Sequence, residues 1–200
     1  MLVVAGELLS KRIDTSDAGR NLAVMLGDGS GAVVVSDTAD SERQCGELVD
    51  MVINADGRQW QSLVTRVPGT ANRQFHQADD GDVGHSFMRM NGPNVFEHGV
   101  TKFCEIAHTI LTRNQLKVAD IDKFIVHQPN LRMLEEIQHK LDIDPQKMPI
   151  NVTDYGNMAS ASTAVTLAQS CQSGVIQKGD WVLILSYGAG ATWAGALVKF

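Results

Sequence analysis

Apolar side chains recur at three- and four-residue intervals between residues 94 and 112. The recurring positions are Val95, Phe96, Val100, Phe103, Ile106, Ala107, Ile110 and Leu111. This spacing puts all of them on one face of an α-helix, so the stretch is predicted to be an amphipathic helix. Residues 131–141 are predicted to form a second helix, which stops near Pro145 because proline cannot continue a helix.

Short apolar runs predict the strands of a sheet. Residues 2–7 have the composition of a buried strand, and residues 48–54 and 124–126 are predicted to form two more. Residues 22–26 lead through Gly27-Asp28-Gly29-Ser30-Gly31 into a β-branched run, which predicts a strand that is broken by glycines and then continues. A sequence that opens on an interior strand is typical of part of a larger sheet, so we expect a truncated or differently bounded chain.

Small side chains dominate a third helical stretch, residues 157–175. They are Ala159, Ser160, Ala161, Ser162, Ala164 and Ala168. Because such residues let backbones approach closely, this helix is expected to run through the middle of the domain. Residues 181–186 and 192–198 are predicted to be strands joined by the turn Tyr187-Gly188-Ala189-Gly190. Strands that alternate with helices indicate an α/β fold, and the closing hairpin predicts a mixed sheet.

Charge and composition narrow the classes of function. The net charge of −6 and the pI of about 5.4 argue against a nucleic-acid partner. No apolar run reaches the roughly 20 residues that a membrane helix needs. Cys45, Cys104 and Cys171 lie far apart without metal-ligand spacing, so they are expected to be reduced thiols of a cytoplasmic protein. Residues 11–20 and 68–84 have the composition of loops.

His127 is the first candidate for chemistry. It ends the apolar run 124–126 and opens His127-Gln128-Pro129-Asn130. The carboxyl end of a strand is where α/β sheets gather ligands, which favours a catalytic role. A structural histidine with satisfied hydrogen bonds is the alternative. The other histidines are expected in loops or on helices without a chemical role: His76, His85, His98, His108 and His139.

Asn157 is the second candidate, and it also has two interpretations. It stands in Tyr155-Gly156-Asn157, where the small-residue helix is predicted to begin. Asparagine is a good N-cap, which would be a purely structural role. If the helix crosses the interior, however, the asparagine faces a crevice and its amide is available as a hydrogen-bond donor.

The glycine-bearing segments do not predict a nucleotide site. Gly27-x-Gly29-x-Gly31 and Gly188-x-Gly190 lack the dinucleotide spacing, and neither is followed by a helix that could face a phosphate. Gly188 and Gly190 would instead let backbone amides approach a ligand closely, as an oxyanion site requires.

A series of motifs in a fixed order carries a family resemblance. They are Gly27-Asp28-Gly29-Ser30-Gly31-Ala32, Met90-Asn91-Gly92 with Val95-Phe96, His127-Gln128-Pro129-Asn130-Leu131-Arg132, Tyr155-Gly156-Asn157-Met158-Ala159-Ser160-Ala161-Ser162 and Gly188-Ala189-Gly190-Ala191-Thr192-Trp193. Together they resemble the C-terminal part of 3-oxoacyl-acyl-carrier-protein synthase III, a condensing enzyme of fatty acid synthesis. The resemblance spans nearly the whole chain.

The resemblance implies a fold and a reaction. The fold is the thiolase-like one, in which two α/β halves stack as helix, sheet, helix, sheet and helix. Residues 1–90 would be the end of the N-terminal half with its connection, and residues 91–200 the C-terminal domain. In the implied reaction a cysteine takes an acyl group from acyl-CoA, and malonyl-acyl carrier protein then loses carbon dioxide and attacks the thioester. The resemblance also implies a homodimer and no cofactor or metal.

The resemblance further implies roles for single residues. His127 and Asn157 would be the catalytic pair, donating an imidazole N–H and an amide N–H to the developing enolate oxygen. The backbone N–H of Ala189 would belong to the second oxyanion site. Four residues would line the channel for the pantetheine arm, namely Met90, Gly92, Asn130 and Tyr187. Arg132 would help to dock the acidic carrier protein, or it is simply an exposed helix charge.

The nucleophilic cysteine of the family has no counterpart in this sequence, and it would lie before Met1. Neither Cys45, Cys104 nor Cys171 stands in a matching motif, so the chain alone is expected to be unable to condense. Two functions are therefore weighed: part of a true synthase, or a non-catalytic subunit that pairs with an active homologue. Retention of both His127 and Asn157 favours the synthase, because a scaffold has no chemical need for them.

Overall fold

A four-stranded mixed sheet forms the centre of the computed structural model, which describes residues 1–37, 46–67, 69 and 87–200. Its strands, in spatial order, are β3 (Glu47–Ala55), β8 (Thr192–Lys199), β7 (Trp181–Gly188) and β6 (Lys123–Val126). β6 runs parallel to β7, whereas β8 is antiparallel to both β7 and β3. The predicted strands and the mixed character of the sheet are confirmed.

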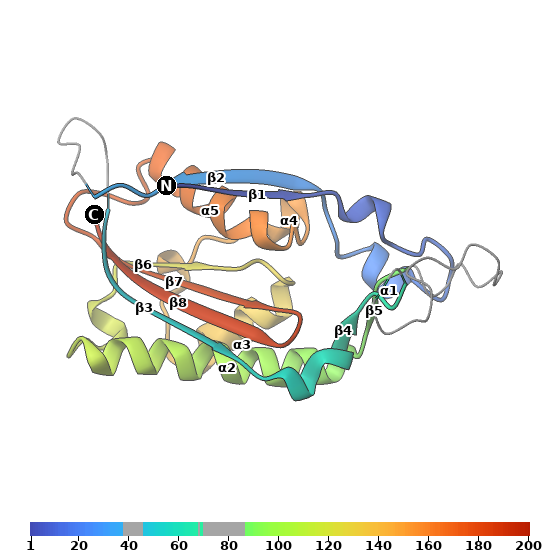
Figure 1. Cartoon of the computed structure of the whole chain (residues 1–200). Coiled ribbons are helices and arrows are strands. Elements are labelled where there is room, and N and C mark those ends of the chain that lie inside the picture. Colours follow the sequence, from blue (N-terminus) through green and yellow to red (C-terminus); the bar gives the residue numbers. More distant parts are fainter. Residues whose placement is uncertain (38–45, 68, 70–86) are drawn as a thin grey trace.

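Two helices cover one face of this sheet, α2 (Gly92–Arg113) and α3 (Leu131–Leu141) (Figure 1). Both confirm the predictions from sequence. The apolar face of α2 is buried against the sheet through Phe103, Ile106 and Ile110. α3 ends at a left-handed residue ahead of Pro145, so the expected stop is also confirmed.

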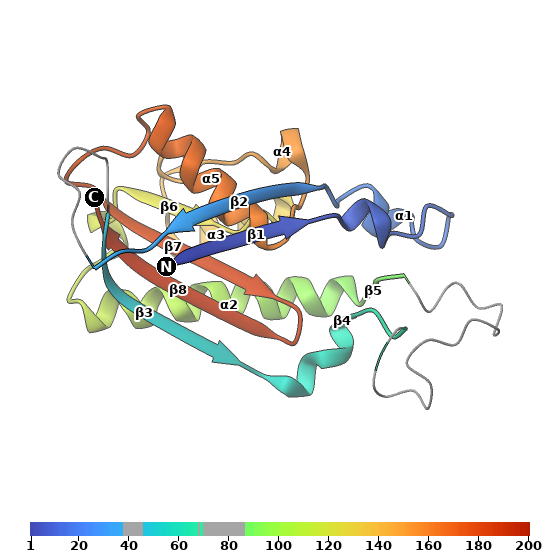
Figure 2. The ribbon, with the colours of Figure 1, turned by 45° about the horizontal axis from the view of Figure 1, so that its top comes forward.

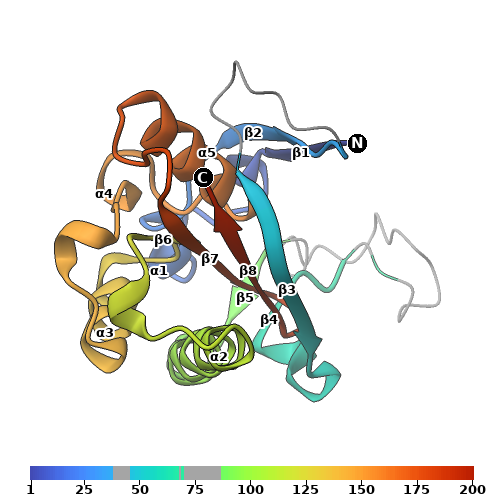
Figure 3. The ribbon, with the colours of Figure 1, turned by 90° about the vertical axis from the view of Figure 1, so that its left-hand side faces the viewer.

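The small-residue helix α5 (Ser160–Gln172) lies on the opposite face of the sheet (Figure 3). Beyond it lies a second sheet, in which β1 (Leu2–Glu7) pairs antiparallel with β2 (Gly29–Val34). The layers therefore run helix, sheet, helix, sheet. As predicted, α5 passes through the middle of the domain, with sheet strands on both sides.

Three predictions near the N-terminus and α5 need correction. Residues 22–26 do not begin a strand, because a short helix, α1 (Arg20–Ala23), takes up the first two of them. Residues 2–7 do form a strand, but Leu2 and Val4 are about two-thirds exposed, so the strand is not buried among the described residues. α5 begins at residue 160 rather than 157, because Asn157 pairs through its backbone with the segment before β2.

Short elements connect the layers, and several gather at one end of the molecule (Figure 2). The short elements are η1 (Leu9–Lys11), η2 (Gly57–Ser62), β4 (Leu63–Val64), β5 (Arg89–Met90), η4 (Val118–Asp120), η5 (Pro145–Lys147) and α4 (Val152–Tyr155). The loop predicted for residues 68–84 lies outside the described residues except for residue 69, and so do Cys45, His76 and His85.

The glycines before and within β2 explain how the second sheet comes so close to α5. A Cβ at Gly27 would lie 2.0 Å from the Tyr155 carbonyl oxygen. One at Gly29 would lie 2.4 Å from the Met158 sulfur, and one at Gly31 would lie 2.7 Å from the Ala164 Cβ. These glycines are therefore packing residues, which agrees with the rejection of a phosphate loop.

Gly27→Ala is expected to lower the free energy of unfolding by about 1–3 kcal/mol, because the new methyl group meets a backbone oxygen that cannot move aside easily. Gly57→Ala is the matched control, since a Cβ there meets nothing within 4 Å. Urea denaturation of both variants measures the difference. Equal free energies of unfolding for the two variants would contradict this account of the packing.

Candidate functional site

His127 directly follows β6, and its backbone N–H donates to the Leu185 carbonyl at 2.8 Å. This bond continues the parallel pairing of β6 with β7 by one residue and fixes the ring at the carboxyl end of the sheet. Nδ1 of the ring lies 2.7 Å from Oγ of Ser162 on α5. His127 therefore links the central sheet to the buried helix.

Burial lowers the pKa of the His127 imidazole from its ordinary value to about 4, although the nearby Ala159 carbonyl opposes the shift. No charged side chain contributes to this change among the described residues. The ring is consequently neutral at pH 7. A neutral imidazole carries a single N–H, so the nitrogen that holds the proton decides what the ring can do.

Hydrogen bonds of its backbone and of its side-chain oxygen hold Asn157 in place. Its N–H donates to the Met25 carbonyl at 2.7 Å, and its own carbonyl accepts from Gly27 at 3.0 Å. Its side-chain oxygen accepts the Ala159 N–H at 2.8 Å. The amide nitrogen has no hydrogen-bond partner within the described ranges, so it is available as a donor.

The N-cap interpretation of Asn157 is not supported by this geometry, because the residue at the N-cap position of α5 is Ala159. Ala159 has a φ of 43°, a region that side-chain-bearing residues rarely adopt and that costs about 1–3 kcal/mol. Its N–H is bound by Asn157, and its carbonyl accepts from Ser162 Oγ at 2.8 Å. This strained residue therefore connects the Asn157 side chain, through Ser162, to His127.

Gln128 is fully buried, and no pattern in the sequence indicated its role. Its side-chain nitrogen donates to the Val126 carbonyl at 2.9 Å, and its oxygen accepts from the N–H groups of Asn151 and Val152 at 3.0 and 3.2 Å. These bonds tie the chain just before α4 to the end of β6. Gln128 thus helps to position the segment that leads to Asn157.

Ala189 lies in the turn between β7 and β8, and because β6 runs parallel to β7, this turn is at the same end of the sheet as His127. It is exposed, and its N–H has no backbone partner among the residues that the structure describes. Two backbone hydrogen bonds to Asp56 anchor the turn. The Asp56 N–H donates to the Ala191 carbonyl at 2.8 Å, and the Asp56 carbonyl accepts the Ala191 N–H at 3.1 Å. This geometry leaves the Ala189 amide open to a ligand.

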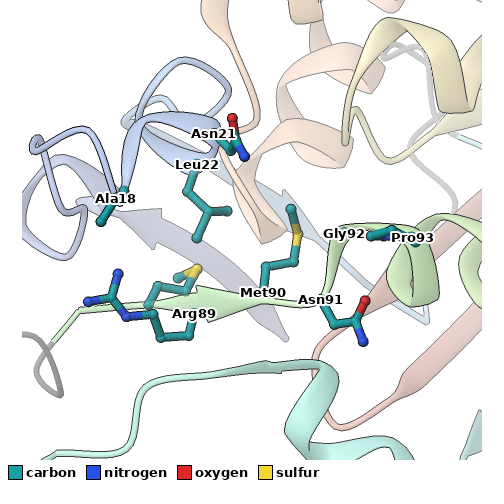
Figure 4. Close-up of a pocket in the computed structure, with 10 residues that line it drawn as sticks. Ala18, Asn21, Leu22, Arg89, Met90, Asn91, Gly92 and Pro93 are labelled. Carbon is teal, nitrogen blue, oxygen red and sulfur yellow. The ribbon is translucent and has the colours of Figure 1, made fainter.

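The predicted channel residues fall into separate environments. Met90 and Gly92 line a pocket of about 360 Å³ between α1 and the start of α2, where the Leu22 side chain faces them (Figure 4). Asn130 and Tyr187 do not line this pocket. The chain as described therefore brings only two of the four residues together.

Asn130 and Tyr187 have structural partners of their own. The side-chain oxygen of Asn130 accepts the Met133 N–H at 2.9 Å and caps α3. The Tyr187 hydroxyl lies 3.0 Å from Nδ1 of His98, and burial raises the pKa of the phenol. His98 thus has a contact that the sequence did not suggest.

Arg132 and the cysteines complete the candidates. Arg132 is exposed in the first turn of α3 and has no ion pair among the described residues. Cys104 and Cys171 are half-buried, and burial raises the pKa of both thiols. A raised pKa reduces the thiolate fraction, so neither has the character of an activated nucleophile.

Among the residues that the structure describes, no three His, Cys, Asp or Glu side chains are placed to hold a metal ion. Nor does any helix there combine the length and apolar character needed to cross a membrane.

The layer order and the mixed sheet define the class: this is the thiolase-like fold, as predicted. A solved beta-ketoacyl-acyl-carrier-protein synthase III from Thermus thermophilus superposes with a TM-score of 0.83 at 32% identity, over 100% of this chain and 58% of that one. The 3-oxoacyl-acyl-carrier-protein synthase III of Aquifex aeolicus gives a TM-score of 0.82 at 28% identity, over 100% of this chain and 57% of that one.

The family follows from the sequence comparisons. The C-terminal family model of 3-oxoacyl-[acyl-carrier-protein (ACP)] synthase III matches residues 111–200, and a second model of the same family matches residues 1–57. The chain belongs to the 3-oxoacyl-acyl-carrier-protein synthase III family, which confirms the resemblance. The division predicted at residue 90 stays a prediction, because it falls between the two matched ranges.

Curated relatives support the same family and define the extent of the match. Beta-ketoacyl-acyl-carrier-protein synthase III of Oleidesulfovibrio alaskensis is 34% identical over 199 residues, and that of Nitratidesulfovibrio vulgaris is 37% identical over 201. Both alignments cover 100% of this chain and 59% of the relative. The chain thus spans about three-fifths of the length of these relatives.

Titration of His127 tests the buried, neutral ring. Its pKa is expected to be about 4, so the free energy of unfolding should fall as the pH drops from about 6.5 toward 4. The sign follows because the unfolded chain takes up a proton in this interval and the folded chain does not. Ring NMR gives the pKa, and urea denaturation at each pH gives the stability.

His127→Gln provides the reference, because it removes the titrating ring and should flatten this part of the pH dependence. An imidazole that titrates near 6.5 in the folded chain would contradict the burial argument.

Proposed function

We propose that this chain is the part of a 3-oxoacyl-acyl-carrier-protein synthase III that stabilises developing negative charge while acyl-CoA condenses with malonyl-acyl carrier protein. The observation that carries the proposal is the amide nitrogen of Asn157, which has no hydrogen-bond partner among the described residues while the side-chain oxygen accepts from Ala159. A scaffold subunit would have no use for such an unpartnered donor. The reaction class is that of the relatives, which are beta-ketoacyl-acyl-carrier-protein synthases III.

Charge stabilisation is what this reaction demands of the protein. Loss of carbon dioxide from a malonyl thioester places negative charge on the thioester oxygen, so the site needs fixed polar groups rather than a strong base. The Asn157 amide supplies one donor, and the His127 ring supplies a second polar group with its Nε2 unpartnered among the described residues. The exposed Ala189 N–H suits the oxyanion of the acyl-transfer step.

The nucleophile, in this proposal, comes from a cysteine outside the 200 residues. Two observations support this. Burial raises the thiol pKa of Cys104 and Cys171, which disfavours the thiolate that attacks an acyl group. The chain also spans only 59% of the length of its relatives.

Substrate access is assigned by position. The pocket at Met90 and Gly92 is proposed to take part of the pantetheine arm, and Asn130 and Tyr187 are proposed to meet that arm once the site is complete. Arg132, which is exposed and forms no ion pair with any residue that the structure describes, is proposed to contact the acidic carrier protein. The assembled enzyme is proposed to be a cytoplasmic homodimer.

The test is to co-express this chain with the N-terminal portion of a related synthase and to measure turnover of acyl-CoA and malonyl-acyl carrier protein. Asn157→Ala should lower turnover by about 10²–10³, the usual cost of one oxyanion donor, and His127→Ala should lower it by a similar factor because it removes the second polar group of the site. Exposed residues provide matched controls, His139→Ala on α3 and Asn54→Ala on β3, which should leave turnover unchanged. Wild-type turnover in both site variants would refute the proposed roles.

Acyl transfer to the isolated chain tests the missing nucleophile. Incubation with labelled acyl-CoA followed by intact-mass measurement should show no covalent acyl group, because no described thiol is activated. Stoichiometric labelling of Cys45, Cys104 or Cys171 would show that the nucleophile lies within this chain.

A further inference from the structure

The Ser162 hydroxyl is buried in α5 and lies within hydrogen-bond distance of three groups. Its Oγ is 2.7 Å from Nδ1 of His127, 2.8 Å from the Ala159 carbonyl oxygen and 3.2 Å from the Gln128 backbone nitrogen. These groups come from the end of β6 and from the start of α5. The serine therefore sits at the junction of the two elements that carry the site.

The donors and acceptors around this hydroxyl leave one consistent arrangement. A hydroxyl has one hydrogen to donate and two lone pairs to accept with. The Gln128 N–H can only donate, so it takes one lone pair. The Ala159 carbonyl can only accept, so it takes the single hydrogen. The remaining lone pair faces Nδ1 of His127, and this contact is a hydrogen bond only if the ring donates.

We propose that Ser162 is a positioning residue that keeps the proton of the neutral His127 imidazole on Nδ1 and leaves Nε2 as a hydrogen-bond acceptor. The opposite arrangement points the hydroxyl hydrogen at Nδ1. It would leave two oxygen atoms 2.8 Å apart, Ser162 Oγ and the Ala159 carbonyl, with no hydrogen between them. That contact is repulsive, and it leaves a buried carbonyl with one donor fewer.

A second observation points the same way. The Ala159 carbonyl raises the pKa of the His127 ring while burial lowers it, so an acceptor lies where it favours a ring N–H. Nε2, on the other side of the ring, has no partner in the described part of the chain. The Ala159 carbonyl favours a ring N–H, and the contact with Ser162 decides which nitrogen carries it.

The consequence for the site rests on the proposed function. Asn157 would be the side-chain donor that faces the developing oxyanion, whereas the resting His127 would present a lone pair to a thiol or water hydrogen. His127 would donate from Nε2 only after it gains a proton. This division of roles differs from the pair of N–H donors that the family resemblance suggests.

The protonated nitrogen can be observed directly in the 200-residue chain. Long-range nitrogen–proton NMR on chain labelled with ¹⁵N-histidine distinguishes a bare ring nitrogen from a protonated one, and His127→Gln assigns the signals. The wild type is expected to show His127 protonated at Nδ1 at pH 7. A His127 ring protonated at Nε2 would overturn the proposal.

Three variants test whether Ser162 is the cause. Ser162→Ala should shift His127 toward a mixture of tautomers, and Ser162→Thr, which keeps the hydroxyl, should retain the wild-type signal. Ser160→Ala is the matched control, because Ser160 lies on the same helix but is exposed and bonds to Glu7 instead. Unaltered His127 nitrogen signals in Ser162→Ala, with the rest of the spectrum native, would also overturn the proposal.

Turnover of the co-expressed enzyme separates this inference from the proposed function. Ser162→Ala is expected to lower kcat about 10- to 100-fold with little change in KM, and Ser162→Thr should restore most of it. A changed tautomer with unchanged turnover would uphold the positioning role and contradict the catalytic use of His127.

Discussion

Helix α5 lies so close to β2 that a Cβ at Gly31 would lie 2.7 Å from the Ala164 Cβ, and this contact is the constraint on which the site depends. It holds the start of α5 between the two sheets, where Ala159 adopts its unfavourable backbone conformation. The Asn157 side-chain oxygen accepts the N–H of Ala159, and the Ser162 hydroxyl donates to its carbonyl. A larger side chain at these contacts would move both Asn157 and the partner of His127.

The site is therefore built from backbone as much as from side chains. Asn157 is aligned by two main-chain bonds to the segment before β2, and His127 by one main-chain bond to β7. The strain at Ala159 is retained because hydrogen bonds on both of its peptide groups over-determine it. An asparagine and a histidine held in this way present their remaining polar atoms with little freedom, which is what preorganised electrostatic stabilisation requires.

The sequence predicted the regular elements well because their patterns are local. The spacing of Phe103, Ile106 and Ile110 depends only on the helical period, and the β7–β8 hairpin follows from two apolar runs around glycines. The start of α5 was misplaced because Asn157 pairs with residues more than a hundred positions away. No local signal carries that information.

The candidate site was predictable only in part, for the same reason. His127 and Asn157 stood out by their place at element boundaries and by family motifs. Gln128 and Ser162 did not, because a buried glutamine or serine acquires its role from neighbours that only the folded chain supplies. Asn130 shows the converse, since its side chain caps α3 and would be needed there whatever the channel binds.

The two sheets also end on the same side of the molecule, with β1 and β3 as their outer strands (Figure 3). Within the described residues β1 pairs only with β2 and β3 only with β8, and both strands expose apolar side chains, among them Val4 and Ile53. Unpaired apolar edges are templates for association with other strands. The edge strands on this side are therefore open to pairing with any extended polypeptide that can complete the two sheets.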